Sequence, residues 1–204
     1  MRYQKIVPGI FIDRPNRFLA YVLINGEIKL IHIMNSRRCS EILIPRARVF
    51  LGETGFNHKR KDEYSLISAF KGVKLINIDS QIPNKLASNA FKNDNLPGID
   101  VGKEIKREVS YKSSRLDMTY RYQKKKGFIE VKGVTLENKG IASFPDAPTI
   151  RGTKYINELI TAAQAGYENY IIFVIQMKGI NIFRTNNEHL QSSFKKSIYR
   201  KYLH

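Results

Sequence analysis

The dipeptide Asn25-Gly26 constrains the fold more than any other stretch of the chain. It stands between two apolar runs, RFLAYVLI before it and EIKLIHIM after it. Asn-Gly between two such runs is the strongest short signal for a β-hairpin, because both residues tolerate the positive φ of a tight turn. The sequence therefore predicts two antiparallel strands near the N-terminus.

Further strand signals follow in the first 80 residues. The stretch ILIPRARVFLGE predicts one strand, and YSLISAFKGVKLINIDS predicts two more. Five or so short strands separated by turn residues favour a small barrel or sandwich. The pattern changes at QIPNKLASNAFKNDNLPG, where Pro83 and Asn84 precede a short helix over 85–92 and Pro97-Gly98 ends it. We expect a β-domain over residues 1–83 and a second domain over 84–204.

The second half mixes helices and strands. Three strand-like stretches, EIKREVSYKS, SRLDMTYRYQ and GFIEVKGVTL, come first. RGTKYINELITAAQAG then has the apolar spacing of a helix that ends at Gly166. NYIIFVIQM predicts a strand buried on both faces, INIFRTN predicts another strand, and HLQSSFKKSIYRKYLH predicts a basic amphipathic helix. This half is expected to be an α/β domain with a mixed central sheet.

The charge balance favours an anionic partner. The chain has 35 Lys and Arg against 18 Asp and Glu, a net charge of +17. Nucleic acid is the first candidate and an acidic membrane surface the second, although a solvated basic surface without a partner also fits. The single Cys39 and the charged N-terminus indicate a cytoplasmic protein without a signal peptide. The longest apolar run, 170–175, is far below the roughly 20 residues of a membrane helix. The oligomeric state is open, and a dimer is one option.

One group of charged residues falls at predicted strand centres. Glu130 and Lys132 are two apart in GFIEVKGVTL, so they share a face, and Asp117 is 130 − 117 = 13 residues earlier on the preceding strand. Buried charges need compensation. Two carboxylates are suitable ligands for Mg²⁺ or Mn²⁺, and a neighbouring lysine can orient water or stabilise charge on a phosphate. Asp followed by Glu-x-Lys is typical of restriction-endonuclease-like nucleases. A cross-strand ion pair at Lys132 is the structural alternative.

Basic residues elsewhere are candidates for phosphate contacts. Arg151 and Lys154 open the predicted helix after Asp146, where a helix N-terminus suits an anion, although Thr149 as an ordinary helix cap also explains this stretch. On the barrel half, Arg37, Arg38, Arg46 and Arg48 form either a solvated edge or a groove for nucleic acid. Phe50 or Tyr64 would then serve as stacking platforms.

The segments SRLDM, EVKGVTL and FPDAPTIRGTKYINEL resemble the sugar fermentation stimulation protein family, and the likeness extends over nearly the whole chain. The resemblance implies an N-terminal OB-like barrel and a C-terminal restriction-endonuclease-like domain. It also implies DNA binding linked to regulation of sugar metabolism, with nuclease activity inferred from the fold. Asn89 stands where many members have a glutamate, which puts metal affinity in question. Gln176 falls where the family has a polar residue.

We therefore expect a DNA-binding protein with a metal-dependent nuclease site. Asp117 and Glu130 would hold Mg²⁺ or Mn²⁺, and Lys132 would be catalytic. The expected nucleic-acid contacts are Arg37, Arg38, Arg46, Arg48, Arg115, Arg151 and Lys154, supported by Asp146 and Gln176. The first rival is a DNA-binding regulator that performs no chemistry. The second is a protein that binds RNA or a protein partner, in which the three charged residues form only an ion pair.

Overall fold

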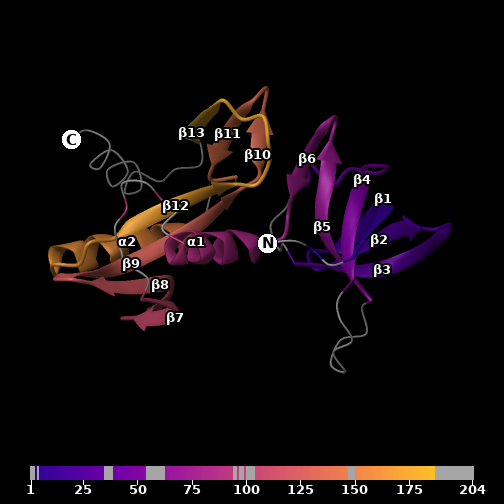
Figure 1. Cartoon of the computed structure of the whole chain (residues 1–204). Coiled ribbons are helices and arrows are strands. Elements are labelled where there is room, and N and C mark those ends of the chain that lie inside the picture. The colour runs from indigo at the N-terminus through magenta and orange to yellow at the C-terminus, as the bar shows by residue number, and fades with distance from the viewer. Residues whose placement is uncertain are drawn as a thin grey trace. The chain divides into compact units, whose positions relative to one another are not determined.

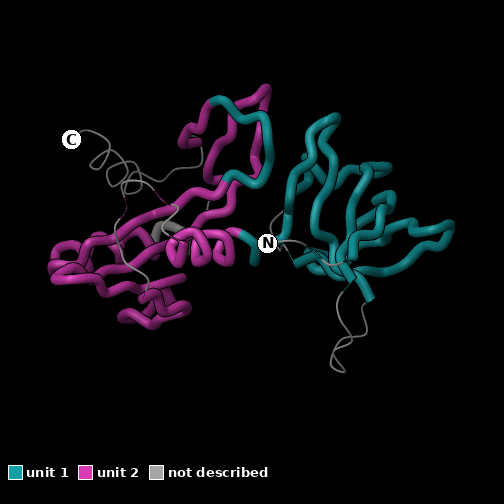
Figure 2. The backbone as a smooth tube through the Cα atoms, in the orientation of Figure 1, with its two compact units in different colours: residues 1–82, 175–181 teal, residues 83–174, 182–204 magenta. Residues whose placement is uncertain are grey.

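The computed structural model describes residues 3, 5–34, 39–53, 63–93, 96, 99, 104–146 and 150–186, without the side chains of 150–153. The chain forms two compact units (Figure 2). The first contains residues 1–82 and 175–181, and the second contains 83–174 and 182–204. Within the described residues, no helix is both long enough and apolar enough to cross a membrane.

The first unit is a closed β-barrel (Figure 1). Its sheet has the strand order β3-β2-β1-β4-β5-β6. Parallel pairing of β3 with β5, through His32↔Ser65 and Ile33↔Leu66, closes five of the strands into a ring. This is the expected OB-like barrel. The strands are β1 (Ile6–Asn16), β2 (Leu19–Ile24), β3 (Glu27–Ile33), β4 (Arg48–Glu53), β5 (Tyr64–Lys71) and β6 (Lys74–Asn77).

The predicted hairpin at Asn25-Gly26 is confirmed. Asn25 has φ 50° and Gly26 has φ 86°, the left-handed values that a two-residue turn requires. The turn sets the register Ile24↔Glu27 and Leu23↔Ile28 along β2 and β3. Because side chains alternate along each strand, Ala20 and Val22 enter the barrel core while their neighbours face outward.

The second unit contains two sheets and two helices. A four-stranded sheet has the order β12-β9-β8-β7, and a three-stranded sheet has the order β10-β11-β13. The smaller sheet is mixed, because β10 and β11 are antiparallel and β11 and β13 are parallel. The elements are α1 (Ile82–Lys92), β7 (Ile105–Tyr111), β8 (Ser114–Tyr122), β9 (Lys125–Val134), β10 (Leu136–Asn138), β11 (Ile141–Phe144), α2 (Ile150–Gln164), β12 (Tyr170–Ile175) and β13 (Ile182–Thr185).

The two helices cover opposite faces of the four-stranded sheet. Ala87 and Phe91 of α1 form a core with Ile129 of β9. Leu159 of α2 forms a separate core with Phe128, the neighbour of Ile129 on β9. Adjacent residues of a strand point to opposite faces, so α1 and α2 sandwich the sheet. Side chains at the centre of β9 are therefore shielded from solvent on both sides.

Residues 175–181 follow the predicted domain boundary in sequence, and in the structure they group with the first compact unit. A bridge between Ile76 and Met177 and a hydrogen bond from Asn77 N to Gln176 O at 2.9 Å attach the segment to β6. The preceding strand β12 differs from the prediction, because it is half-buried rather than fully buried. It lies at the edge of its sheet. The predicted C-terminal helix lies outside the described residues.

Candidate functional site

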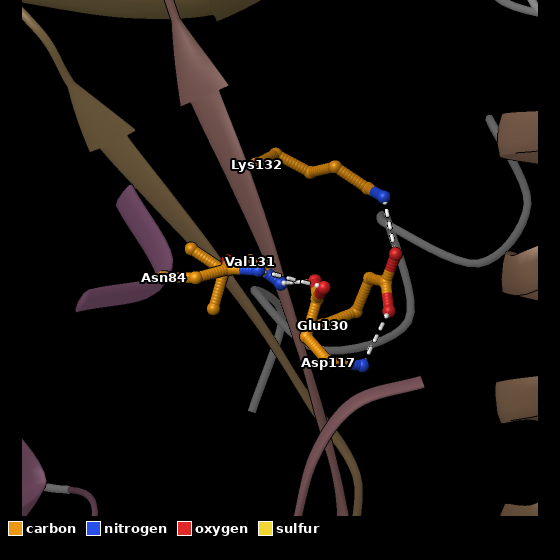
Figure 3. Close-up of polar contacts among 5 residues, drawn as sticks. All are labelled: Asn84, Asp117, Glu130, Val131 and Lys132. Carbon is orange, nitrogen blue, oxygen red and sulfur yellow. Dashed lines mark hydrogen bonds and ion pairs between the residues drawn. The ribbon is translucent and has the colours of Figure 1, made fainter. Parts of the chain in front are cut away.

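Asp117 and Glu130 meet where regular pairing between β8 and β9 stops. The backbone pairs run from Tyr122↔Lys125 to Met118↔Ile129. Beyond this point, the side-chain carboxylates of Asp117 and Glu130 accept hydrogen bonds from backbone N–H groups of the neighbouring strand (Figure 3). Asp117 Oδ2 accepts a hydrogen bond from the N–H of Val131 at 2.8 Å, and Glu130 Oε2 accepts one from the N–H of Asp117 at 3.4 Å. Each acidic side chain thus binds to the backbone of the neighbouring strand.

The pairing of β8 with β7 is also irregular at Asp117. The pairs Arg107↔Met118 and Val109↔Leu116 leave Glu108 opposite Asp117. Glu108 has φ 56°, a left-handed value that is uncommon for a residue with a side chain. Leu116 then packs with the α2 core while Met118 packs with the α1 core. The strand therefore departs from regular alternation at its one acidic residue.

Lys132 forms a buried ion pair with Glu130. Lys132 Nζ lies 2.5 Å from Glu130 Oε1, and the two side chains are 12% and 5% exposed. Burial raises the pKa of Glu130, the charge of Asp117 raises it further, and Lys132 opposes both effects. The ammonium of Lys132 also lies 5.2 Å from the ring centroid of Tyr155 on α2. The prediction that Asp117, Glu130 and Lys132 lie on two adjacent strands is thus confirmed.

Asn84 is the site residue that the sequence did not indicate. Its Nδ2 donates a hydrogen bond to Asp117 Oδ1 at 2.8 Å (Figure 3). The available signal was helical spacing: Asn84, Ala87 and Phe91 are three and four residues apart, so they share the face of α1 that meets the sheet. Asn89, which replaces the family's glutamate, is instead exposed on that helix.

The two carboxylates fit a divalent cation. Each of their four oxygens accepts one hydrogen bond or ion pair from the protein, and a carboxylate has about four lone-pair sites, so acceptor capacity remains on both groups. Burial and the charge of Asp117 raise the pKa of Glu130, and a cation beside the two carboxylates would act in the opposite direction. Among the described residues, no cluster of three or more His, Cys, Asp or Glu could hold a metal. Two carboxylates with water and phosphate are a usual set for Mg²⁺.

The other predicted residues of the second unit lie around this sheet. Arg115 is exposed, and its Nη2 pairs with Glu108 Oε2 at 2.5 Å. Lys154, in the first turns of α2, donates from Nζ to the carbonyl of Ser113 at 3.1 Å. Arg151 belongs to the same helix, but its side chain is not among those described. Asp146 is half-buried in the bend after β11. The structure does not bring Arg115 or Lys154 into direct contact with the carboxylates.

The predicted site residues that belong to the first unit are four arginines and Gln176. Arg46 and Arg48 are exposed on the barrel, whereas Arg37 and Arg38 lie outside the described residues. Gln176 has a structural role in the barrel unit: its Nε2 donates to the carbonyl oxygens of Asn77 at 3.0 Å and Asp79 at 3.3 Å. These hydrogen bonds anchor the segment 175–181, which explains a polar residue at the end of an apolar strand.

Known proteins are similar to the chain over nearly its whole length. Family profiles match in two parts, an SfsA N-terminal OB domain over residues 12–78 and a sugar fermentation stimulation protein RE domain over 81–202. A sugar fermentation stimulation protein homolog of Alkaliphilus oremlandii is 48% identical, covering 97% of this chain and 86% of the relative. A homolog from Clostridium beijerinckii is 50% identical, covering 92% and 82%.

A solved structure has the same fold. SfsA of Pyrococcus furiosus, in complex with Ca²⁺, superposes with a TM-score of 0.87 at 27% identity and covers 98% of this chain and 84% of that one. The OB domain and the restriction-endonuclease-like domain are thus supported by sequence and by structure, as the resemblance implied. The chain belongs to the sugar fermentation stimulation protein family.

Proposed function

We propose that this chain binds DNA and hydrolyses its phosphodiester bonds at the Asp117–Glu130–Lys132 site with the aid of a divalent cation. The observation that carries the proposal is the convergence of two carboxylates and one ammonium on adjacent strands of a restriction-endonuclease-like unit. An ion pair alone needs one acid and one base. The second carboxylate, Asp117, adds a half-buried negative charge beside Glu130. This charge costs stability, and a functional role would explain why it is present.

Asp117 and Glu130 would hold Mg²⁺ or Mn²⁺. Such a cation supplies positive charge that polarises a phosphodiester and eases the deprotonation of water. The protein holds the two carboxylates in place: Asn84 and the N–H of Val131 bind one oxygen each of Asp117, and the N–H of Asp117 binds Glu130. Groups fixed in this way need little reorganisation on binding, which favours affinity.

Lys132 would supply the mobile positive charge of the site. It is paired to Glu130, and when Glu130 serves as a metal ligand the ammonium of Lys132 would be available to orient a phosphate or an attacking water. The ring of Tyr155 remains beside the ammonium at 5.2 Å and limits where it can go. Lys132 therefore contacts both Glu130 and Tyr155, and the proposed mechanism changes only its contact with Glu130.

Two further facts support the proposal. The net charge of +17 favours a polyanionic ligand, for which phosphate neutralisation drives binding. The similar protein from Pyrococcus furiosus was solved in complex with Ca²⁺, a cation that takes oxygen ligands as Mg²⁺ does. A DNA ligand also accords with the cytoplasmic location expected from the sequence.

The second candidate function is a DNA-binding regulator, linked to sugar metabolism, that performs no chemistry. The side chain that α1 directs at Asp117 favours this candidate, because it is the amide of Asn84 and not a third carboxylate. The amide of Asn84 stabilises the Asp117 carboxylate by a hydrogen bond in the absence of metal, so the fold can keep this carboxylate for structural reasons alone.

The deciding experiment measures metal binding and cleavage on the same preparations. Calorimetry with Mn²⁺ and cleavage of labelled single-stranded and duplex DNA are run on wild type, on Glu130→Gln, and on Glu27→Gln as a matched control at an exposed strand position. The proposal expects wild type and Glu27→Gln to bind Mn²⁺ and cut, and Glu130→Gln to stay folded but do neither. Salt-dependent DNA binding by all three without metal binding or cleavage would identify the inactive regulator instead.

A further inference from the structure

The outer face of the barrel carries a continuous row of side chains across its sheet. Pairing sets Ile10 of β1 opposite Leu23 of β2 and opposite Arg48 of β4, and Phe70 of β5 opposite Leu75 of β6. The neighbours of these residues along their strands, Val22, Val49, Ala69 and Ile76, are buried in the barrel core. Because side chains alternate, the row itself faces outward.

Within this row, β4 and β5 form an aromatic and cationic surface. The Arg48 guanidinium lies over the ring of Phe70, 4.2 Å from its centroid. Phe50, two residues after Arg48 and on the same face of β4, has its ring centroid 6.0 Å from that of Phe70. Pro8 of β1 pairs with Phe50 and extends the flat apolar surface. Arg48 is exposed and both phenylalanines are half-buried, so part of each ring is accessible to solvent.

The described charged side chains nearest to Arg48 and Phe70 in the sequence are positive. Arg46 is exposed two residues before Arg48, and the turn between β5 and β6 begins and ends with Lys71 and Lys74, which are paired across it. Exposed carboxylates also occur on these strands, at Asp13 of β1 and at Glu53 of β4, and Glu53 is paired with Lys5. A surface of this composition is complementary to a phosphate backbone that carries flat aromatic bases.

The opposite part of the row differs in chemistry. The outward residues of β2 and β3 are mainly aliphatic, with Leu23, Ile28 and Leu30 exposed beside Tyr21. In OB folds generally, the faces of strands 2 and 3 are the usual oligonucleotide site. In this chain, stacking groups and guanidinium groups are concentrated on β4 and β5 instead.

We propose that single-stranded nucleic acid binds across β1, β4 and β5, with bases stacked on Phe50 and on the Arg48–Phe70 pair and with phosphates held by Arg46 and Arg48. The ligand is single-stranded because bases in a duplex are already stacked on one another and present no free faces. This inference rests on the proposed function in assuming a nucleic-acid ligand, and it adds the strandedness and the site.

The test measures binding of labelled oligothymidylate and of an equally long duplex by fluorescence anisotropy, in EDTA so that no cleavage occurs. The full-length variants Phe50→Leu and Phe70→Leu keep apolar bulk but remove an aromatic face, and Arg48→Gln removes the charge. Two matched controls remove aromatic rings elsewhere on the barrel. Tyr21→Leu lies on the β2–β3 face, and Phe18→Leu lies in the β1–β2 turn, where Arg17 stacks on Phe18 at 4.7 Å.

We expect the single strand to bind more tightly than the duplex. Phe50→Leu and Phe70→Leu should weaken single-strand binding by on the order of tenfold, since stacking of one base contributes that much or more. Arg48→Gln should weaken it and lower the salt dependence by about 0.7 in the log–log slope, the loss of one phosphate contact. Both controls should bind as wild type does, and melting curves confirm that each variant is folded.

Three results would overturn the inference: equal binding of duplex and single strand, loss of affinity in Tyr21→Leu or Phe18→Leu but not in the β4 and β5 variants, or no nucleic-acid binding at all, which would indicate a protein partner for this face. The proposed catalysis is tested separately. It is wrong if Glu130→Gln binds metal and cleaves DNA as wild type does.

Discussion

Asp117 donates its backbone N–H to the carboxylate of Glu130, while the carboxylate of Asp117 accepts the N–H of Val131, the residue after Glu130. Each of the two acids therefore completes the backbone hydrogen bonding of the other's strand. Replacing either one by alanine removes a proposed metal ligand and also leaves a part-buried N–H without its acceptor. Loss of activity in a variant of either residue can therefore come from unfolding, so the stability of each variant is measured alongside its activity.

The raised pKa of Glu130 predicts how stability depends on pH. The folded state binds the proton of this carboxyl group more tightly than the unfolded state, whose pKa is near the ordinary value of 4.5. Its contribution to stability is thus fully present below pH 4.5 and is lost as pH rises through the raised pKa. We expect the free energy of unfolding of metal-free wild type, relative to Glu130→Gln, to fall across this window, by at most about 1.4 kcal/mol per pH unit.

Urea unfolding of both proteins at a series of pH values measures this difference. Adding Mg²⁺ should reverse the trend, because the cation competes with the proton for Glu130 and stabilises the folded state more as pH rises. Glu27→Gln is the control and should follow wild type at every pH. A difference between wild type and Glu130→Gln that does not change with pH would show that burial does not control this carboxyl group.

The hydrogen bond from Asn84 to Asp117 predicts opposite effects on stability and metal affinity. Asn84→Ala should cost about 1–2 kcal/mol of unfolding free energy, because it removes a donor to a charged group. Asn84→Asp should destabilise the metal-free protein through repulsion with Asp117 but bind Mn²⁺ more tightly, because it adds a ligand oxygen. Urea unfolding and calorimetry measure the two quantities.

Asn89→Ala provides the matched control on the same helix, since Asn89 is exposed. It should leave stability within about 0.5 kcal/mol of wild type and metal affinity unchanged. If Asn89→Asp instead of Asn84→Asp tightened metal binding, the role assigned to Asn84 would be wrong. Variants of Asn84 and Asn89 thus distinguish the residue that contacts the site, Asn84, from the one that the family resemblance indicated, Asn89.

The sequence predicted those features that depend on local pattern. The hairpin at Asn25-Gly26 follows from its turn residues, and the placement of Asp117, Glu130 and Lys132 on two adjacent strands follows from strand alternation over a short loop. Asn84 could not be recognised in the same way, because its partner is 33 residues away and the contact depends on how α1 packs against the sheet.

The role of Gln176 was missed for a related reason. Its hydrogen bonds join residues about 100 positions apart, to Asn77 and Asp79, and attach a segment of the second half of the chain to the barrel unit. A polar residue at a strand end is compatible with a catalytic role and with an anchoring role. Only the tertiary structure shows which groups accept its protons.

The contact between Lys132 and Tyr155 predicts that the aromatic ring helps to position the ammonium. Tyr155→Phe keeps the ring near the ammonium and should preserve this contact. Tyr155→Leu removes the ring and should cost about 0.5–2 kcal/mol, with reduced cleavage because Lys132 is less well positioned. A double-mutant cycle with Lys132→Met isolates the pair, and a coupling energy near zero would show that the two side chains do not interact.

Gly127 at the start of the site strand predicts a large effect from one added methyl group. A Cβ at this position would lie 1.6 Å from the carbonyl oxygen of Glu168, a backbone atom that cannot rotate away. Gly127→Ala must therefore displace β9 or the turn that precedes β12, and we expect a loss of at least about 3 kcal/mol. Gly52→Ala is the control, because the atoms nearest its Cβ would belong to side chains, those of Ile67 at 3.4 Å and Tyr3 at 3.9 Å. Thermal and urea unfolding measure both variants, and equal stability of the two would show that the backbone around Gly127 yields readily.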